Sequence, residues 1–313
     1  MRDFKMVLAK FDWRELISEY LHSHTLIYMC RMMIVNGTDK TSLELIRNGQ
    51  LNKVKKLLKR KYKNTINQPL NSNVIQKHSD YVWICWFQGL ESSPEIVKTC
   101  VDSIVKHFPE KEIKIITAEN IEKYVRIPDV IHEKWEKGII SNAHFSDILR
   151  VLLLIKYGGI WIDATVFMSF RDNNLMATID RADLFFFQKL KPGRDGHAIY
   201  LSSWFMSSVS NNPILQRTLE LLLKYWENYN YLLNYFLFHI FLQITLDSFS
   251  SYMNDIPKYD SGLPHLLLFQ LNNKYDELIY KDIINRSPVN KLTYKNIDLD
   301  KEDTVYKHIL KLK

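Results

Sequence analysis

The stretch from Gly158 to Val166 reads GGIWIDATV, and it decides the fold of this chain. The two glycines end a helix predicted from Asn142 to Tyr157, because glycine readily adopts the left-handed backbone that follows a helix. The next residues, 160–166, are predicted to form a strand with Trp161, Asp163 and Thr165 on one face. A carboxylate inside an apolar strand is costly unless it is paired, protonated or bound to a metal. The sequence therefore marks Asp163 as the leading functional residue.

A strand, a helix and a second strand precede this stretch. Residues 81–87 form an unbroken apolar run, as is typical of a strand that is covered on both faces. Residues 93–108 have apolar side chains at helical spacing, and residues 113–117 form another short strand. Such a unit implies parallel strands, whose ligands bind at the carboxyl ends. We therefore expect a site that joins Gln88-Gly89 to the end of the strand that carries Asp163.

The rest of the chain adds further strands and helices. Strands are predicted at 184–188 and 199–207, and a helix at 213–226. Residues 231–246 are strongly apolar and contain no charged side chain, so a membrane-spanning helix is one interpretation. The four polar residues within this run favour a buried helix instead. The predicted fold class is α/β, with a mixed sheet flanked by helices and an N-terminal helical segment.

Composition excludes several classes of protein. Of the 313 residues, 46% are apolar and 25% are charged, which excludes a disordered chain. The three cysteines form no CxxC pair, so neither a zinc finger nor a disulfide framework is expected, and a cytosolic setting is favoured. Residues 1–16 hold no apolar segment of the kind found in signal peptides.

The positive charge is concentrated at the N-terminus. Residues 1–75 carry 14 Lys or Arg and 6 Asp or Glu, whereas the remainder carries 28 and 29. We predict a basic helical segment over 1–75, with loops near 36–37 and 48–49, and a catalytic domain over 76–313. Because the larger part is neutral, no nucleic-acid partner is expected.

Residues 51–63 of this segment form an amphipathic helix. One face is apolar and the others are almost wholly cationic; the apolar face consists of Leu51, Val54, Leu58 and Tyr62. Such a helix can pack on the body of the protein through its apolar face, lie on an anionic membrane surface or contact a nucleic acid. The sequence leaves these three interpretations open.

The predicted helix before Gly158 carries an acid and a base, Asp147 and Arg150, three residues apart and hence on one face. Together with Asp163 they offer a cation for phosphate or sugar hydroxyls and an oxygen ligand for a hard metal. Transfer from a nucleotide sugar needs that combination, because its diphosphate leaving group must be neutralised. From spacing alone, an intrahelical ion pair beside a buried strand is the other interpretation.

The run SDILR at 146–150, followed after seven residues by GGIWID at 158–163, resembles the sugar-binding region of the DXD-containing glycosyltransferases of family 32. It is most similar to their bacterial capsular polysaccharide synthesis branch. Further matches are WICWFQG at 83–89, YFLFH at 235–239 and KLTYK at 291–295. The resemblance covers roughly residues 80–295.

The resemblance implies a GT-A-like, Rossmann-like fold, a UDP-hexose donor, a divalent cation (Mn²⁺ or Mg²⁺) and retention of anomeric configuration. It places Asp147 and Arg150 near the ribose or sugar hydroxyls and Asp163 as the first acid of the DXD motif. The other donor-binding positions that it implies are Trp86, Phe87, Gln88, Gly89, Trp161, His265 and Lys291.

One position departs from the family pattern. Thr165 stands where the second acid of the motif is usual, and a hydroxyl binds Mg²⁺ or Mn²⁺ more weakly than a carboxylate does. Either Asp163 holds the metal with help from Thr165 and His265, or Lys291 and Arg150 carry the phosphate charge. Front-face displacement would need only positioning and electrostatics, and Gln188 is a candidate residue near the reacting face.

The functional prediction is a hexosyltransferase that moves galactose or glucose from a UDP-sugar onto a lipid-diphosphate-linked saccharide. It would act in the cytoplasm, peripherally on the inner face of the cell membrane, which its basic N-terminal segment would contact. Two alternatives stay open: sugar transfer to a protein side chain, and a non-enzymatic protein that binds a membrane or a nucleic acid.

Overall fold

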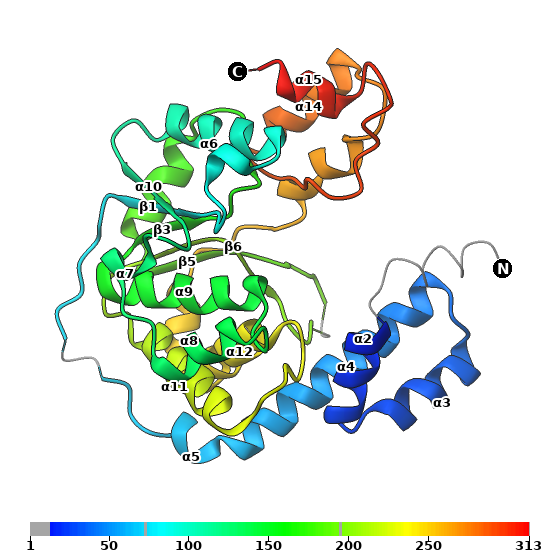
Figure 1. Ribbon diagram of the computed structural model, residues 1–313, viewed down its shortest axis with the longest axis vertical. Coiled ribbons are helices and arrows are strands. Elements are labelled where there is room, and N and C mark those ends of the chain that lie inside the picture. Colours follow the sequence, from blue (N-terminus) through cyan, green and yellow to red (C-terminus); the bar gives the residue numbers. More distant parts are fainter. Residues whose placement is uncertain (1–12, 72–73, 194–195, 313) are drawn as a thin grey trace.

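The computed structural model describes residues 13–71, 74–193 and 196–312 (Figure 1). The strands are β1 (Tyr81–Cys85), β2 (Glu112–Ile116), β3 (Gly159–Ile162), β4 (Val166–Met168), β5 (Leu184–Gln188), β6 (Leu201–Ser208) and β7 (Val289–Lys291). The N-terminal helices are α2 (Trp13–His22), α3 (Leu26–Asn36), α4 (Lys40–Lys61) and α5 (Lys63–Ile66). The later α-helices are α6 (Glu95–His107), α7 (Ile121–Tyr124), α8 (Asp129–Glu136), α9 (Asn142–Tyr157), α10 (Asn173–Arg181), α11 (Pro213–Asn228), α12 (Leu237–Ser248), α13 (Ser250–Asp255), α14 (Glu277–Arg286) and α15 (Val305–Leu310). Three short 3-10 turns lie at Leu90–Ser92, Leu263–His265 and Leu267–Gln270.

The five-stranded sheet has the order β2-β1-β3-β6-β5. β1 pairs in parallel with both β2 and β3, whereas β6 is antiparallel to β3 and to β5. α6 connects β1 to β2, as the strand-helix-strand pattern predicted. A separate pair, β4 with β7, is antiparallel. The predicted α/β class is confirmed: a mixed sheet is flanked by helices and preceded by a helical segment.

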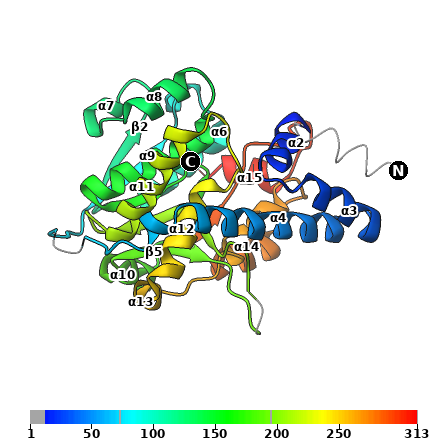
Figure 2. The same cartoon turned by 90° about the horizontal axis from the view of Figure 1, so that it is seen from below.

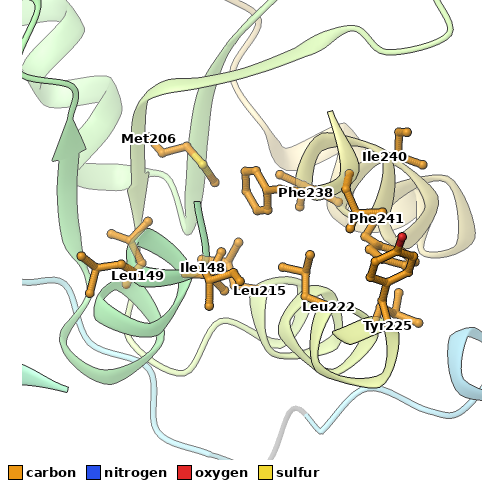
Figure 3. Packing of buried hydrophobic residues seen from close by; sticks show 14 of the residues in the cluster. Ile148, Leu149, Met206, Leu215, Leu222, Tyr225, Phe238, Ile240 and Phe241 are labelled. Atoms are coloured by element: carbon orange, nitrogen blue, oxygen red, sulfur yellow. The ribbon is translucent and has the colours of Figure 1, made fainter. Parts of the chain in front are cut away.

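Helices cover both faces of the sheet (Figure 1). Alternate residues of β1 point to opposite faces, with Trp83 in one buried cluster and Val82 and Ile84 in the other. The first cluster joins the sheet to α9, α11 and α12; Figure 3 shows part of it, with Met206 of β6 pointing toward Phe238 of α12. The second cluster joins the opposite face to α6, α10 and α15. Two cores thus hold the ends of the strands in place.

Helix α3 and the start of α4 project from the body of the protein, whereas the end of α4 and α5 lie against it (Figures 1 and 2). The apolar face predicted within residues 51–63 is buried against the body: Leu58 is fully buried and Val54 nearly so. The interpretation that this helix packs by its apolar face is therefore confirmed. The loop predicted near residues 48–49 is wrong, because α4 passes through Gly49 without interruption. Gly49 leaves room for the Tyr28 ring, whose hydroxyl oxygen would lie 1.9 Å from an added Cβ.

Two further predictions need correction. The strand predicted over 160–166 is two strands, because β3 ends at Ile162 and the Asp163 carbonyl accepts a hydrogen bond from the Val166 N–H, which turns the chain. The helix predicted from residue 231 begins only at Leu237. Helix α12 is buried in the first core, and no helix in the described residues is long and apolar enough to cross a bilayer.

Candidate functional site

A cleft of about 770 Å³ opens at the carboxyl ends of β1 and β3, where the strand order predicted a ligand site. Asp163 and Trp161 line it from β3 and the turn that follows, and the loop after β1 and the segment after β7 contribute further lining residues. The residues that line it are Cys85, Trp86, Phe87, Gln88, Ser92, Asn142, Ala143, Ser146, Trp161, Asp163, Ala164, Thr165, Tyr235, Lys291, Leu292, Thr293, Tyr294 and Lys295.

The backbone fixes Asp163 at the end of β3. Its N–H donates to the Trp204 carbonyl of β6 at 2.8 Å, which extends the β3–β6 pairing by one bond. Its carboxylate oxygen Oδ1 accepts from the Trp161 indole N–H at 2.9 Å, two residues earlier on the same side of the chain. The side chain is 29% exposed. Asp163 is therefore held rigidly while part of its carboxylate faces the cleft.

Lys291 reaches Asp163 from the far end of the chain. β7 pairs with β4 in the register Val166 to Lys291, and this pairing brings the lysine beside the turn after β3. The Lys291 ammonium donates to Asp163 Oδ2 at 3.0 Å and to the Thr165 hydroxyl oxygen. The pair is sheltered, with Lys291 only 19% exposed, so its attraction is screened less than that of a surface ion pair. A cation thus stands directly beside the leading acid in the cleft.

Arg150 and Asp147 are buried residues of α9 that lie next to Asp163, on its side away from the cleft. Arg150 donates through Nη1 to Asp147 Oδ1 and through Nη2 to Asp163 Oδ1, the latter at 3.3 Å. Its guanidinium also lies 4.8 Å from the centre of the Trp161 ring, a cation–π contact. Arg150 is 3% exposed, and neither residue of this ion pair lines the cleft. Both therefore support Asp163 from behind in this structure.

The two acids have opposite pKa shifts. Burial raises the pKa of Asp147 to about 6, although the Arg150 charge opposes the shift. Burial alone would also raise the pKa of Asp163, but the charges of Lys291 and Arg150 bring it below its ordinary value. Asp163 is therefore ionised at neutral pH, and Asp147 is the acid of the pair that titrates nearer to neutrality.

A buried histidine adjoins this network. The His144 Nε2 accepts from the Trp226 indole N–H at 3.0 Å, and its Nδ1 lies 3.8 Å from Asp147 Oδ2. Burial lowers the pKa of His144 to about 3, so the ring is neutral at physiological pH. His239 is also buried, and its pKa is lowered to about 3 by burial and by the nearby Arg150 charge. Neither neutral ring lines the cleft.

Aromatic side chains form the rim of the cleft. Trp86, after β1, and Tyr294, after β7, meet edge to face with ring centroids 5.4 Å apart. Tyr235 lines the cleft from the loop between α11 and α12 and is 58% exposed. Aromatic faces at an opening suit a base or sugar ring. Neither Tyr235 nor Tyr294 was predicted as a site residue; their positions within YFLFH and KLTYK were the only signal in the sequence.

The family described as capsular polysaccharide synthesis protein matches residues 33–309 of the chain. The chain belongs to this family. The predicted capsular polysaccharide synthesis branch is thereby confirmed, whereas the narrower assignment to family 32 with a DXD motif stays a prediction. The match begins within α3 and therefore includes α4. The resemblance seen in the sequence began only near residue 80.

Two similar proteins carry glycosyltransferase names. An O-glycosyltransferase, braB, of Annulohypoxylon truncatum is 26% identical over 162 residues, which are 47% of this chain and 37% of the fungal protein. The chain thus spans well under half the length of that relative. Among solved structures, the PaToxG glycosyltransferase has a TM-score of 0.41 and 16% sequence identity, over 85% of this chain and 94% of its own.

Five of the predicted site residues do not line the cleft: Asp147 and Arg150, described above, and Gly89, Gln188 and His265. Gly89 follows the lining residue Gln88 and has a positive φ of 79°. Gln188 is buried, and its amide donates to the Pro257 carbonyl at 2.9 Å. His265 donates from Nδ1 to the Ser261 carbonyl at 2.6 Å and packs edge-on to Trp204. Their predicted roles in the site remain predictions.

The predicted metal ligands form an incomplete set. Asp163 and Thr165 lie together in the cleft, but His265 does not line it. No group of three or more His, Cys, Asp or Glu in the described residues could hold a metal ion. The single carboxylate already accepts hydrogen bonds on both oxygens, from Arg150 and Lys291 among others. These side chains alone do not fit a divalent cation, which prefers several oxygen ligands, and the expected Mn²⁺ or Mg²⁺ stays a prediction.

Proposed function

We propose that this capsular polysaccharide synthesis protein is a retaining hexosyltransferase. It would move galactose or glucose from a UDP-sugar onto a lipid-diphosphate-linked saccharide at the inner face of the cell membrane. The observation that carries the proposal is the Asp163 carboxylate, which faces a large cleft between the charges of Lys291 and Arg150. The family match and the similarity to an O-glycosyltransferase support transfer of a sugar.

The charges of the cleft suit a nucleotide diphosphate. Lys291 lies at the cleft surface, where its ammonium can pair with phosphate oxygens in place of Asp163. Arg150 adds a buried positive charge behind the same position, where a low dielectric strengthens its effect. Because these cations neutralise the developing charge of the leaving group, they would stabilise the transition state. The predicted Mn²⁺ or Mg²⁺ would need oxygen ligands beyond Asp163 and Thr165, so in this scheme the cations of the protein carry the phosphate charge.

The reaction would be a front-face displacement. The bond between the anomeric carbon and the β-phosphate oxygen breaks while a bond to the acceptor oxygen forms on the same face. The proton of the acceptor hydroxyl passes to the departing phosphate oxygen, so no protein base is required. In this scheme the protein positions the two substrates and supplies electrostatic stabilisation, and the rim side chains Trp86 and Tyr294 would contact the uridine or the sugar.

The test is donor hydrolysis and transfer with a panel of UDP-sugars. We expect release of UDP from UDP-galactose or UDP-glucose, and a loss of about 10²-fold or more in Asp163→Asn. Label that appears in a lipid extract supports a lipid-linked acceptor, whereas label in protein supports the alternative of side-chain glycosylation. A folded protein that turns over no UDP-sugar contradicts the proposal.

A further inference from the structure

Helix α3 presents an apolar face to solvent. Ile27 and Ile34 are each 85% exposed, and Val35 is 70% exposed. Their spacing of seven and eight residues puts them on one side of the helix, together with the exposed Cys30 and Arg31. A face of this kind normally packs against another element. In the described parts of the chain, nothing buries it.

This face is distinct from the surface that the sequence favoured for membrane contact. Leu51, Val54 and Leu58, on the apolar face of α4 that the sequence indicated, are buried and so are not available to a bilayer. In Figures 1 and 2, α3 lies on the part of the N-terminal segment that projects from the body, with its long axis beside α4. Because α3 projects, it can contact a flat surface such as a bilayer while the sheet and the helices that cover it remain away from that surface.

Cations stand along α3. Arg31 lies within the apolar face, and Lys40 begins α4 immediately after the turn that follows α3. Lys53 donates to the His24 carbonyl at 2.9 Å, which places its ammonium at the turn that precedes α3. Residues 13–66 together carry 11 Lys or Arg and 4 Asp or Glu. Apolar side chains accompanied by cations are complementary to an anionic lipid surface, which offers headgroup charge above acyl chains.

The same segment contacts the rim of the cleft. The Glu19 carboxylate of α2 accepts a hydrogen bond from the Tyr235 N–H at 2.8 Å, and Tyr235 lines the cleft. The His22 ring of α2 stacks on Tyr231, in the same loop, with centroids 3.7 Å apart. A surface bound by α3 would therefore lie next to the element that holds this wall of the site.

We infer that the exposed face of α3 docks on an anionic lipid bilayer, with Ile27, Ile34 and Val35 entering the interface and Arg31 pairing with headgroups. The inference deepens the proposed function, on which its purpose rests: docking would bring the cleft to an acceptor that is anchored in lipid. The docking itself requires no donor, so it can be measured apart from sugar transfer.

The test is sedimentation of the full-length chain with vesicles. One set contains phosphatidylglycerol mixed with phosphatidylcholine, and the other contains phosphatidylcholine alone. We expect the wild-type chain to bind the anionic vesicles and to be released by added salt. The double variant Ile27→Gln/Ile34→Gln should bind about tenfold or more weakly, because two large apolar side chains no longer enter the interface. Glutamine keeps the helix propensity of these positions.

The matched control is Leu278→Gln, which removes an 81% exposed apolar side chain from α14 and should bind vesicles as the wild type does. UDP release in solution should be unchanged in the double variant, which separates a failure of docking from a failure of the proposed function. Equal vesicle binding by the double variant and the wild type would overturn the inference. A wild-type dimer in solution that the double variant converts to a monomer would also overturn it, because a second copy would then cover α3.

Discussion

The Lys291 ammonium lies 3.0 Å from Asp163 Oδ2, although 128 positions separate the two residues in the chain. The short pairing of β4 with β7 creates this contact, since Val166 and Lys291 are register partners. Both residues line the cleft, so the Lys291 ammonium offers a positive charge that a diphosphate can use. Because the two residues lie on different segments, the role of each can be tested by a separate substitution.

Replacement of Lys291 by alanine should reduce UDP release by about 10²-fold, because a preorganised cation at the leaving group is lost. The control is Lys295→Ala, which removes an exposed lysine from the rim of the same cleft and should change turnover by less than about threefold. Steady-state kinetics of both variants check the prediction. Equal losses in the two would show that the general positive charge of the cleft matters and that the position of Lys291 does not.

Sequence reasoning predicted those parts of the site that lie close together in the chain. Periodicity put Asp147 and Arg150 on one helix face and Asp163 in the segment that follows, and the family resemblance favoured a shared site over a plain ion pair. Lys291 was predicted as a site residue only through the family resemblance. A three-residue strand such as β7 has too few residues for its sequence pattern to show that it pairs with β4. Tyr235 was missed as a site residue, because it lies in an apolar run that predicted a helix.

Tertiary hydrogen bonds and packing, which leave no pattern in the sequence, account for the parts of the fold that differ from the prediction. The predicted strand 160–166 has unbroken strand character in sequence, but the hydrogen bond between the Val166 N–H and the Asp163 carbonyl turns the chain. The exposed face of α3 could not be predicted either. Its residues are as apolar as those of a core helix, and only the packing of the neighbouring helices shows that they are uncovered.

Turnover should depend on pH through Asp147. Its pKa is raised to about 6, so it carries a negative charge above this pH and a proton below it. Protonation weakens the ion pair that positions Arg150 behind Asp163, and we therefore expect UDP release to fall as the pH drops through about 6. Asp147→Asn should be less active at neutral pH and should lack this step. A pH profile of kcat for both proteins checks the prediction, which an unchanged step in the variant would contradict.

Removal of metal ions with EDTA distinguishes neutralisation of the diphosphate by Lys291 and Arg150 from neutralisation by a divalent cation. If Lys291 and Arg150 carry most of the phosphate charge, EDTA should reduce UDP release by less than about threefold, which is small beside the roughly 10²-fold effect of removing one preorganised charge. The measurement is turnover after EDTA treatment and after Mn²⁺ is added back. A loss of nearly all activity that Mn²⁺ restores would instead support the divalent cation at Asp163 and Thr165.

The start of β3 sets the position of Asp163, and Gly159 is the residue that permits it. Gly159 has a φ of 94°, and an added Cβ would lie 2.3 Å from the Tyr81 carbonyl oxygen of β1. Gly159→Ala should therefore lower the free energy of unfolding by about 3 kcal/mol or more, since it combines a left-handed backbone penalty with a clash inside the sheet.

Two other glycines provide controls for this variant. Gly138 also has a positive φ, of 70°, but no atom within 4 Å of an added Cβ, so Gly138→Ala should cost only about 1–2 kcal/mol. Gly196 has neither constraint, and Gly196→Ala should change stability by less than about 0.5 kcal/mol. Urea unfolding followed by circular dichroism measures all three. If Gly159→Ala costs no more than Gly138→Ala, the close approach of β3 to β1 does not constrain the site, and Asp163 must be positioned by its side-chain partners instead.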